Sequence, residues 1–93
     1  MVVILVVYDI SDDRVRNAVA RRLTSMGFIR IQKSAYVRRG TSGAARYVFR
    51  AVSRMIDKSS DKLLVIAVPD AVYAAASSVG RKGIEEPAKA VLV

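Results

Sequence analysis

Asp9 is the residue of this chain that is best placed to do chemistry. It follows an unbroken apolar run over residues 2–7, and an acidic pair, Asp12 and Asp13, comes soon after it. A carboxylate at the end of a buried strand, close to the start of a helix, is well placed to hold a cation. An aspartate in this position can also be a simple turn former or cap. Because Asp12 and Asp13 already occupy the expected capping positions, Asp9 is left without a local structural role, and we take it as the candidate metal ligand.

The chain contains no histidine and no cysteine. Their absence excludes an imidazole base, a Ser-His-Asp or Cys-His nucleophile, a disulfide framework and a thiolate metal site. Any metal ion must therefore be held by oxygen atoms, which favours magnesium, manganese or calcium over zinc.

The formal net charge is +8, and the basic residues are concentrated in the middle of the chain. Between Arg14 and Ile56 there are ten arginines and one lysine but no acidic residue. Solvated surfaces usually mix both signs of charge, so this segment indicates a polyanionic partner, and the excess of arginine favours planar pairing with phosphates. An anionic membrane surface is the weaker alternative, because no segment combines a lysine-rich face with large exposed apolar anchors.

At 93 residues the chain is expected to form one domain, residues 1–93, of a size at which dimerisation often supplies missing burial. It has no apolar run long enough to cross a membrane. The N-terminal apolar stretch is too short, and too soon followed by charge, for a signal peptide. We therefore expect a cytoplasmic protein that has no membrane partner.

Two uninterrupted apolar runs predict strands that are buried on both faces. Residues 2–7 are β-branched at five of six positions, and residues 63–68 form a second run that Pro69 ends. Between them, residues 28–39 largely alternate apolar and polar side chains, as in a strand with one face on the core. This segment fits one long strand or a hairpin that turns near Lys33 and Ser34, and we prefer the hairpin.

In residues 28–39, every second side chain is expected to face outward, and these outward side chains are basic, polar or aromatic. They are Arg30, Gln32, Ser34, Tyr36 and Arg38. Such a face suits phosphate contact and base stacking. An ordinary solvated sheet face would show the same pattern.

A first amphipathic helix is predicted over residues 12–26, where Asp12 or Asp13 can cap the start and Gly27 can end it. Its apolar face consists of Val15, Ala18, Val19, Leu23 and Met26. Arg22 projects near the middle of that face. We interpret it either as a side chain that extends its charged end to solvent or as a pairing residue at an interface.

A second helix is predicted over residues 43–57, capped by Thr41 or Ser42. Its apolar side chains are Ala45, Val48, Phe49, Val52 and Ile56. Beside them runs a stripe of arginines at i, i+4 and i+8, namely Arg46, Arg50 and Arg54. Like charges at this spacing repel one another, so an anion that lies across them would explain the stripe.

The end of the chain predicts one more strand. Residues 70–79 are alanine-rich and predict a short helix, residues 80–83 predict a basic turn, and residues 86–93 have strand composition. A strand-like tail must pair with an open sheet edge, and a second copy of the chain is the simplest partner. The order of the elements predicts an α+β fold of the ferredoxin-like βαββαβ type with an additional C-terminal strand.

Short motifs at characteristic spacings lie in residues 1–39. Val-Tyr-Asp-Ile at 7–10 is followed by the acidic pair at 12–13, by Arg16-Asn17 and by the helix-ending Met-Gly at 26–27. Arg-Ile-Gln-Lys-Ser at 30–34 then precedes the aromatic Tyr36. Together these motifs resemble the CRISPR-associated protein two family, the small ferredoxin-like partner of the CRISPR integrase in spacer acquisition.

The resemblance implies a homodimer in which the C-terminal strands, residues 86–93 here, exchange onto the partner's sheet. It also implies that two copies of Asp9 face each other across the dimer interface around a divalent ion, Mg²⁺ or Mn²⁺. Some members of the family are metal-dependent endonucleases on RNA or double-stranded DNA. In others the protein serves mainly as the scaffold between two integrase dimers.

Carried over residue by residue, the resemblance makes Asp9 the catalytic residue and metal ligand. The candidate nucleic-acid contacts are Tyr8, Arg16, Arg30, Ser34 and Tyr36. Two positions depart from the family pattern, which often has phenylalanine at Tyr36 and an apolar residue at Arg22. The second departure bears on how the first helix packs.

Phosphodiester cleavage requires a charge sink for the transition state and an activated water, and a metal between two Asp9 carboxylates can supply both. Asp12 and Asp13 could join the ion, but capping is the preferred role. Two hypotheses follow: a metal-dependent endonuclease that uses Asp9, or a non-catalytic nucleic-acid-binding scaffold. A single-strand RNA binder of the RRM type is disfavoured because the paired aromatic sheet motif is missing.

Overall fold

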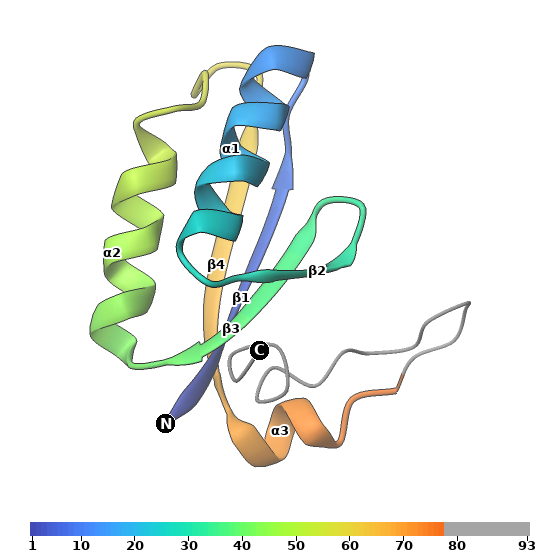
Figure 1. The fold of residues 1–93 in the computed structure, drawn as a ribbon, viewed down its shortest axis with the longest axis vertical. Coiled ribbons are helices and arrows are strands. Elements are labelled where there is room, and N and C mark those ends of the chain that lie inside the picture. Colours follow the sequence, from blue (N-terminus) through green and yellow to red (C-terminus); the bar gives the residue numbers. More distant parts are fainter. Residues whose placement is uncertain (78–93) are drawn as a thin grey trace.

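The computed structural model describes residues 1–77, which form a four-stranded antiparallel sheet with two long helices on one side (Figure 1). The elements are β1 (Val2–Asp9), α1 (Asp13–Ser25), β2 (Ile29–Gln32), β3 (Ala35–Gly40), α2 (Ser42–Ser53), β4 (Lys62–Pro69) and α3 (Asp70–Ala74). Their order confirms the predicted α+β class and βαββαβ plan. The predicted turn at 80–83 and strand at 86–93 lie outside the described residues.

β1 lies in the middle of the sheet, whose strand order is β2-β3-β1-β4. It pairs antiparallel with β3 on one side and with β4 on the other, and Val2 lies opposite both Gly40 and Pro69. The helices α1 and α2 lie side by side across one face (Figure 1). Ile4 and Val6 of β1 are fully buried beneath the helices, and Val3, which alternation places on the opposite face, is fully buried as well, so a polar side chain at these positions would be unfavourable.

The hydrophobic core lies between the sheet and the two long helices. Side chains alternate between the faces of a strand, so Ile4, Val6 and Tyr8 of β1 share the helix side. The amphipathic pattern of each helix turns its apolar residues toward this side of the sheet. The buried residues of the core are Ile4, Val6, Tyr8, Ile10, Val19, Leu23, Phe28, Tyr36, Ala45, Val48 and Val52.

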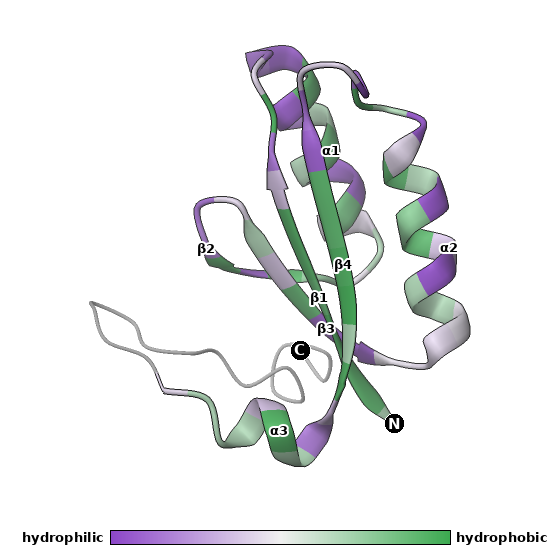
Figure 2. Ribbon diagram, turned by 180° about the vertical axis from the view of Figure 1, so that it is seen from behind, coloured by the Kyte–Doolittle hydropathy of each residue, from purple (hydrophilic) through white to green (hydrophobic). Residues whose placement is uncertain are grey.

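The opposite face of the sheet, which we call the open face, carries exposed apolar side chains. Seen from behind, β4 is hydrophobic along most of its length, and α1 and α2 lie beyond the sheet (Figure 2). Leu64 and Ile66 of β4 are 53% and 38% exposed. The prediction that residues 63–68 are buried on both faces is therefore wrong for this chain alone. β4 is an edge strand, and composition does not distinguish an edge strand from a central one.

The predicted hairpin is confirmed. β2 and β3 are joined by a turn at Lys33 and Ser34, and the pairing shifts register between Arg30 and Gln32. Such an irregularity bends the short strand and increases its twist. The alternating apolar and polar side chains of this segment therefore belong to two paired strands, not to one long strand.

The predicted helix caps are also confirmed. Asp12 precedes α1, and its carboxylate accepts hydrogen bonds from the backbone N–H groups of Arg14 at 2.7 Å and Val15 at 3.2 Å. Thr41 precedes α2 and accepts from the N–H of Ala44 at 3.1 Å. Each cap satisfies donors that have no partner inside the helix.

The helices end earlier than the sequence predicted, except for the first. Gly27 follows α1 with a φ of +87°, a conformation that favours glycine. α2 ends at Ser53, and the helix predicted over residues 70–79 spans Asp70–Ala74. The helices of the described region have 13, 12 and 5 residues, and none of them has the length and hydropathy needed to cross a bilayer.

Phe49 is exposed, contrary to the prediction that it belongs to the apolar face of the second helix. Its exposed fraction is 47%, whereas Ala45, Val48 and Val52 of the same helix are buried. Phe49 lines a groove between α2 and β4. β4 is the edge strand of the sheet, so no further strand lies beside it to cover this side of α2.

Candidate active site at the end of the central strand

Asp9 is the last residue of β1 and lies opposite Lys62 of β4. It is exposed, and strand alternation places it on the open face together with Val7 and Leu64. These residues line a shallow hollow of about 600 Å³. Within residues 1–77 the Asp9 carboxylate makes no hydrogen bond and no ion pair. Its role as a ligand stays a prediction, and its oxygens are not engaged by the described residues.

Asp61, a neighbouring carboxylate, joins the loop after β1 to the loop before β4. Its oxygens accept hydrogen bonds from the backbone N–H of Ser11 at 3.1 Å and from that of Asp57 at 2.9 Å. The hydrogen bonds from Asp57 and Ser11 hold the pKa of Asp61 below its usual value, because they favour the charged form. This carboxylate has a structural role, which distinguishes it from Asp9.

The described residues of one chain do not form a complete metal site. Residues 1–77 contain no group of three or more acidic, histidine or cysteine side chains that could hold an ion. Asp9 alone offers two oxygen atoms of the kind that Mg²⁺ and Mn²⁺ prefer. The donor chemistry therefore fits a hard divalent ion, but the number of ligands fits only if a second carboxylate comes from another copy of the chain.

Tyr8 and Tyr36 are buried beneath the helices. They are 5% and 2% exposed, and their rings stack with centroids 6.0 Å apart. The prediction that Tyr36 lies on an outward-facing parity is wrong, because the register of β3 places it opposite Val6, on the helix side of the sheet. The ring of Tyr36 belongs to the core and has no free face on which a base could stack.

The hydroxyl groups of the two tyrosines lie close to basic side chains. Burial, and then a hydrogen bond with Tyr36, raise the pKa of Tyr8 to about 12. The positive charges of Arg30 and Arg16 act in the opposite direction, so both guanidinium groups lie close enough to influence Tyr8. The carbonyl of Ser34 accepts a hydrogen bond from the N–H of Tyr8 at 3.1 Å.

Arg16 also stabilises the loop between β1 and α1. One of its terminal nitrogens donates a hydrogen bond to the carbonyl of Ile10 at 3.0 Å, and the other pairs with Asp13. The Arg16 side chain is one-third exposed. Because Asp13 neutralises part of its charge, Arg16 is a weaker phosphate contact than a free arginine would be.

The structure therefore gathers the predicted residues at one end of the sheet but divides them between its faces. Asp9 lies on the open face. Tyr8, Arg16, Arg30 and Tyr36 lie on the helix side, and the Ser34 turn lies at the edge between the two. The end of β1 is therefore the place where the two groups come nearest to each other.

Tyr47 was not among the candidate functional residues predicted from the sequence. It is 59% exposed and lines a groove between α1 and α2 together with Arg22, which is also exposed. Arg22 thus extends into this groove rather than into the core. The arginine stripe of the second helix was the sequence signal that pointed to this groove. Which residue of the first helix faces the stripe depends on how the two helices pack.

The sequence matches known proteins over most or all of its length. The family model of CRISPR associated protein Cas2 matches residues 1–75. A protein from Aeropyrum pernix named CRISPR-associated endoribonuclease Cas2 is 39% identical over 94 residues, which cover 100% of this chain and 99% of that protein. A protein of the same name from Korarchaeum cryptofilum is 37% identical and covers 84% of each chain.

Solved structures show the same fold. A hypothetical protein from Thermus thermophilus matches with a TM-score of 0.69 and 26% identity, over 88% of this chain and 93% of that one. Cas2 from Streptococcus pyogenes matches with a TM-score of 0.69 and 17% identity, over 84% of this chain and 99% of that one. The family match over residues 1–75 and the 39% identity to the Aeropyrum pernix protein over the whole chain establish that the chain belongs to the CRISPR associated protein Cas2 family.

Proposed function

We propose that this protein is a metal-dependent endonuclease that cleaves phosphodiester bonds of RNA or double-stranded DNA as a homodimer. We assign it to CRISPR spacer acquisition, with the CRISPR integrase subunit as its partner. The relatives from Aeropyrum pernix and Korarchaeum cryptofilum carry the name endoribonuclease, which supports the reaction class. The high positive charge supports a nucleic-acid substrate.

The observation that carries the proposal is the unpaired Asp9 on an open apolar sheet face. Leu64 and Ile66 share this face with Asp9 and are exposed in the single chain. Two copies that pack through their open faces would bury these side chains, which is favourable by about 25 cal/mol per Å² of apolar surface. A two-fold axis that passes beside the end of β1 would bring the two Asp9 carboxylates together. Exchange of residues 86–93 would extend the same interface.

In this proposal the paired Asp9 carboxylates hold Mg²⁺ or Mn²⁺. The ion, when bound, would stabilise the charge of the transition state and lower the pKa of an attacking water. Without it, the two carboxylates repel each other, so the ion also relieves a repulsion within the dimer. Most of the coordination shell would be left to water and phosphate oxygens, which suits Mg²⁺.

The residues on the helix side would hold the backbone of the substrate. Arg30 is exposed, and the partly buried Ser34 lies in the adjacent turn, so both can contact phosphates near the end of β1. Tyr8 and Tyr36 would not contact the substrate. Their hydrogen-bonded pair would instead stabilise the end of β1, which carries Asp9. Arg16 would contribute through the loop that it stabilises as well as through its charge.

The test is an Asp9→Asn variant, assayed on RNA and on double-stranded DNA with Mg²⁺ and with a chelator. We expect cleavage to fall on the order of 100-fold or more, because the ion loses its protein ligands. Asp12→Asn is the matched control: it makes the same charge change near the same strand end, and asparagine caps a helix as well as aspartate does. It should keep its activity. Cleavage that survives Asp9→Asn would exclude the catalytic role.

The second candidate is a non-catalytic scaffold that grips nucleic acid for the integrase. It is favoured by the arginine-rich helix side, together with a single free carboxylate at the strand end of each chain. It predicts that Asp9→Asn leaves the affinity for nucleic acid unchanged while no metal-dependent cleavage is seen even for the unaltered protein. A steep fall of affinity with salt would support phosphate contacts in either case.

A further inference from the structure

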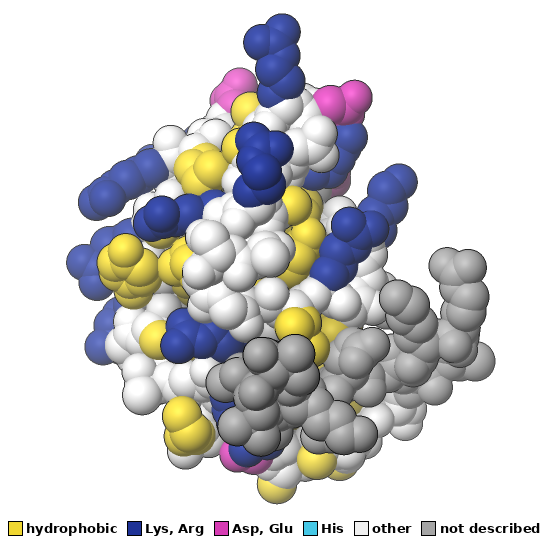
Figure 3. Space-filling model, in the orientation of Figure 1, with side chains coloured by type: hydrophobic (Ala, Val, Ile, Leu, Met, Phe, Trp, Pro, Cys, Tyr) yellow, Lys and Arg dark blue, Asp and Glu magenta, His cyan; other side chains and the backbone are white. Residues whose placement is uncertain are grey.

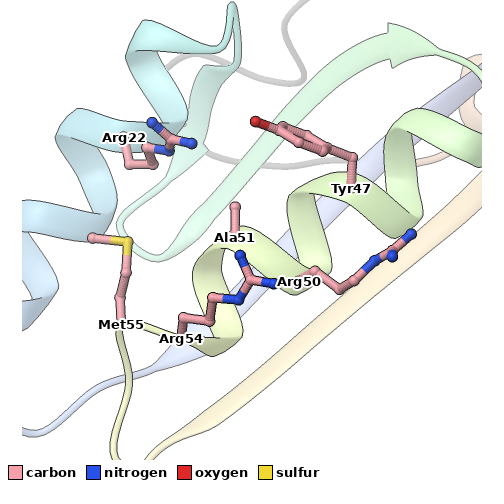
Figure 4. Close-up of a pocket in the computed structure, with 6 residues that line it drawn as sticks. All are labelled: Arg22, Tyr47, Arg50, Ala51, Arg54 and Met55. Carbon is pink, nitrogen blue, oxygen red and sulfur yellow. The ribbon is translucent and has the colours of Figure 1, made fainter.

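A groove between the two long helices carries a concentration of positive charge. It has a volume of about 590 Å³ and is lined by Arg22 of α1, by Tyr47, Arg50 and Ala51 of α2, and by Arg54, which caps the end of α2. In Figure 4 the Arg22 guanidinium and the Tyr47 hydroxyl point toward each other across the groove. Both helices lie on the side of the sheet opposite to Asp9, so this groove is separate from the proposed cleavage site.

The arginines of this groove have no acidic partner in the described part of the chain. Within residues 1–77 the ion pairs are Arg16 with Asp13 and Arg39 with Asp70. Figure 3 shows basic side chains projecting over the helix side, whereas acidic side chains appear only near its two ends. Cations at i, i+4 and i+8 on α2 repel one another, so their concentration here is unfavourable for the free protein.

Two exposed aromatic residues accompany the arginines on α2. Tyr47 and Phe49 are 59% and 47% exposed. Tyr47 lines the groove toward α1, whereas Phe49 lines a second groove of about 440 Å³ toward β4, together with Arg46 and Arg50. Alternation of arginine with exposed aromatic rings is typical of surfaces that bind single-stranded nucleic acid, because the rings stack on bases while the arginines contact phosphates.

We propose that this α2 surface, made of Arg22, Arg46, Tyr47, Phe49, Arg50 and Arg54, binds a single strand of nucleic acid. Successive arginines of α2 are about 6 Å apart along the helix axis, a spacing of the same order as that between phosphates of an extended strand. An acidic protein segment would satisfy the charges but would leave the two aromatic rings exposed. A single strand satisfies both.

The inference stands apart from the proposed cleavage, because the two surfaces lie on opposite sides of the sheet. In a dimer formed through the open faces, each protomer would present its α2 surface outward. The protein would then hold two single strands, or two parts of one, at a distance from the paired Asp9 residues. The surface therefore has the same role whether the strand end cleaves nucleic acid or not.

The test measures binding of a fluorescent oligouridylate of about 12 nucleotides to full-length protein that carries Asp9→Asn, in the presence of a chelator. Cleavage then cannot affect the result, whatever the outcome for the proposed function. The variant Arg22→Gln with Arg54→Gln should weaken binding about 10-fold and reduce the magnitude of the salt slope by about 1. The control is Arg14→Gln with Lys58→Gln, which removes the same charge from exposed positions outside the groove.

A second pair of variants tests the aromatic contribution. Tyr47→Leu should weaken binding of the single strand about 5-fold, and Tyr47→Phe should retain it, because phenylalanine still stacks. A duplex RNA of the same length should be insensitive to Tyr47→Leu. Circular dichroism confirms that each variant is folded, and the control variants show the effect of charge alone.

Three outcomes would overturn the proposal. The first is an equal loss of affinity in the control that lacks Arg14 and Lys58. The second is competition by polyglutamate as strong as that by an oligouridylate of equal charge, which would indicate an acidic protein partner. The third is an unchanged affinity of Tyr47→Leu for the single strand.

Discussion

The helix side and the open face of the sheet are built from the same strands, yet they differ in packing and in charge. On the helix side, Ile4 and Val6 are fully buried and the outer surface is rich in arginine. On the open face, Leu64 and Ile66 remain exposed beside the unpaired Asp9. The first side is complete within one chain, because two amphipathic helices cover it. The second leaves apolar surface and a carboxylate without a partner in one chain, and in the proposed dimer a second copy would cover that surface and supply a second metal ligand.

The largest expected effect comes from a comparison of one truncated isoleucine on each face of the sheet. Ile4→Ala on the helix side should reduce the free energy of unfolding by about 2–5 kcal/mol, because it leaves a cavity in the core. Ile66→Ala on the open face should cost less than about 1.5 kcal/mol at protein concentrations where the chain is monomeric, since Ile66 is already 38% exposed. Urea denaturation measures both values. Equal costs would show that the open face is covered within one chain.

The tyrosine pair provides a smaller effect that belongs to the helix side. Tyr8 has a pKa of about 12 in the folded chain, against 10.0 for an ordinary tyrosine. The unfolded chain therefore releases its proton first as the pH rises, and stability that is fully present below pH 10 is lost between about pH 10 and pH 12.

Tyr8→Phe should reduce this alkaline loss, which is on the order of 2 kcal/mol. Unfolding by urea between pH 9 and pH 12 measures the slope in both proteins. The variant Tyr47→Phe is the control, because Tyr47 is an exposed tyrosine on the outer surface of α2. A variant Tyr8→Phe that follows the same curve as the unaltered protein would show that the buried pair does not bind its protons more tightly than the unfolded chain does.

The smallest effect on folding is expected at Leu64, where the effect on assembly should be large. Leu64 is 53% exposed, so Leu64→Glu should change the stability of the monomer by no more than about 0.5 kcal/mol. In the proposed dimer the new carboxylate would be buried next to its symmetry mate and near Asp9, which is strongly unfavourable. Sedimentation velocity should therefore show a monomer, and cleavage should be lost. A stable dimer would place the interface elsewhere.

Local patterns predicted much of this fold. The hairpin turn at Lys33 and Ser34, the cap by Asp12 and the ending of the first helix at Gly27 all depend on neighbouring residues, and all are confirmed. Asp9 was predicted as a free carboxylate because the capping roles were already filled, and its side chain is unpaired within the described residues. These features involve short sequence separations, so periodicity and propensity were sufficient.

The errors concern which side of an element meets the core. Tyr36 and Phe49 were each placed on the wrong side, since Tyr36 is buried and Phe49 is exposed. An alternating strand has two faces, and its pattern does not say which face the helices cover. A helix position at the edge of the apolar face becomes buried only if a neighbouring element reaches it. The burial of Tyr36 depends on the register of β3 against β1, and the exposure of Phe49 on the position of β4 at the edge of the sheet.

By itself, the sequence determined the order of the elements, the caps of the two long helices, the excess of positive charge and the single free carboxylate at the end of the first strand. Only the tertiary structure decided that Asp9 and the arginine-rich helices lie on opposite sides of the sheet, and that Arg22 meets Tyr47 across a groove. The physical reason is the range of the interactions. Caps, turns and periodicity act between residues close in the chain, whereas strand order and helix packing come from contacts between distant segments, which no local pattern encodes.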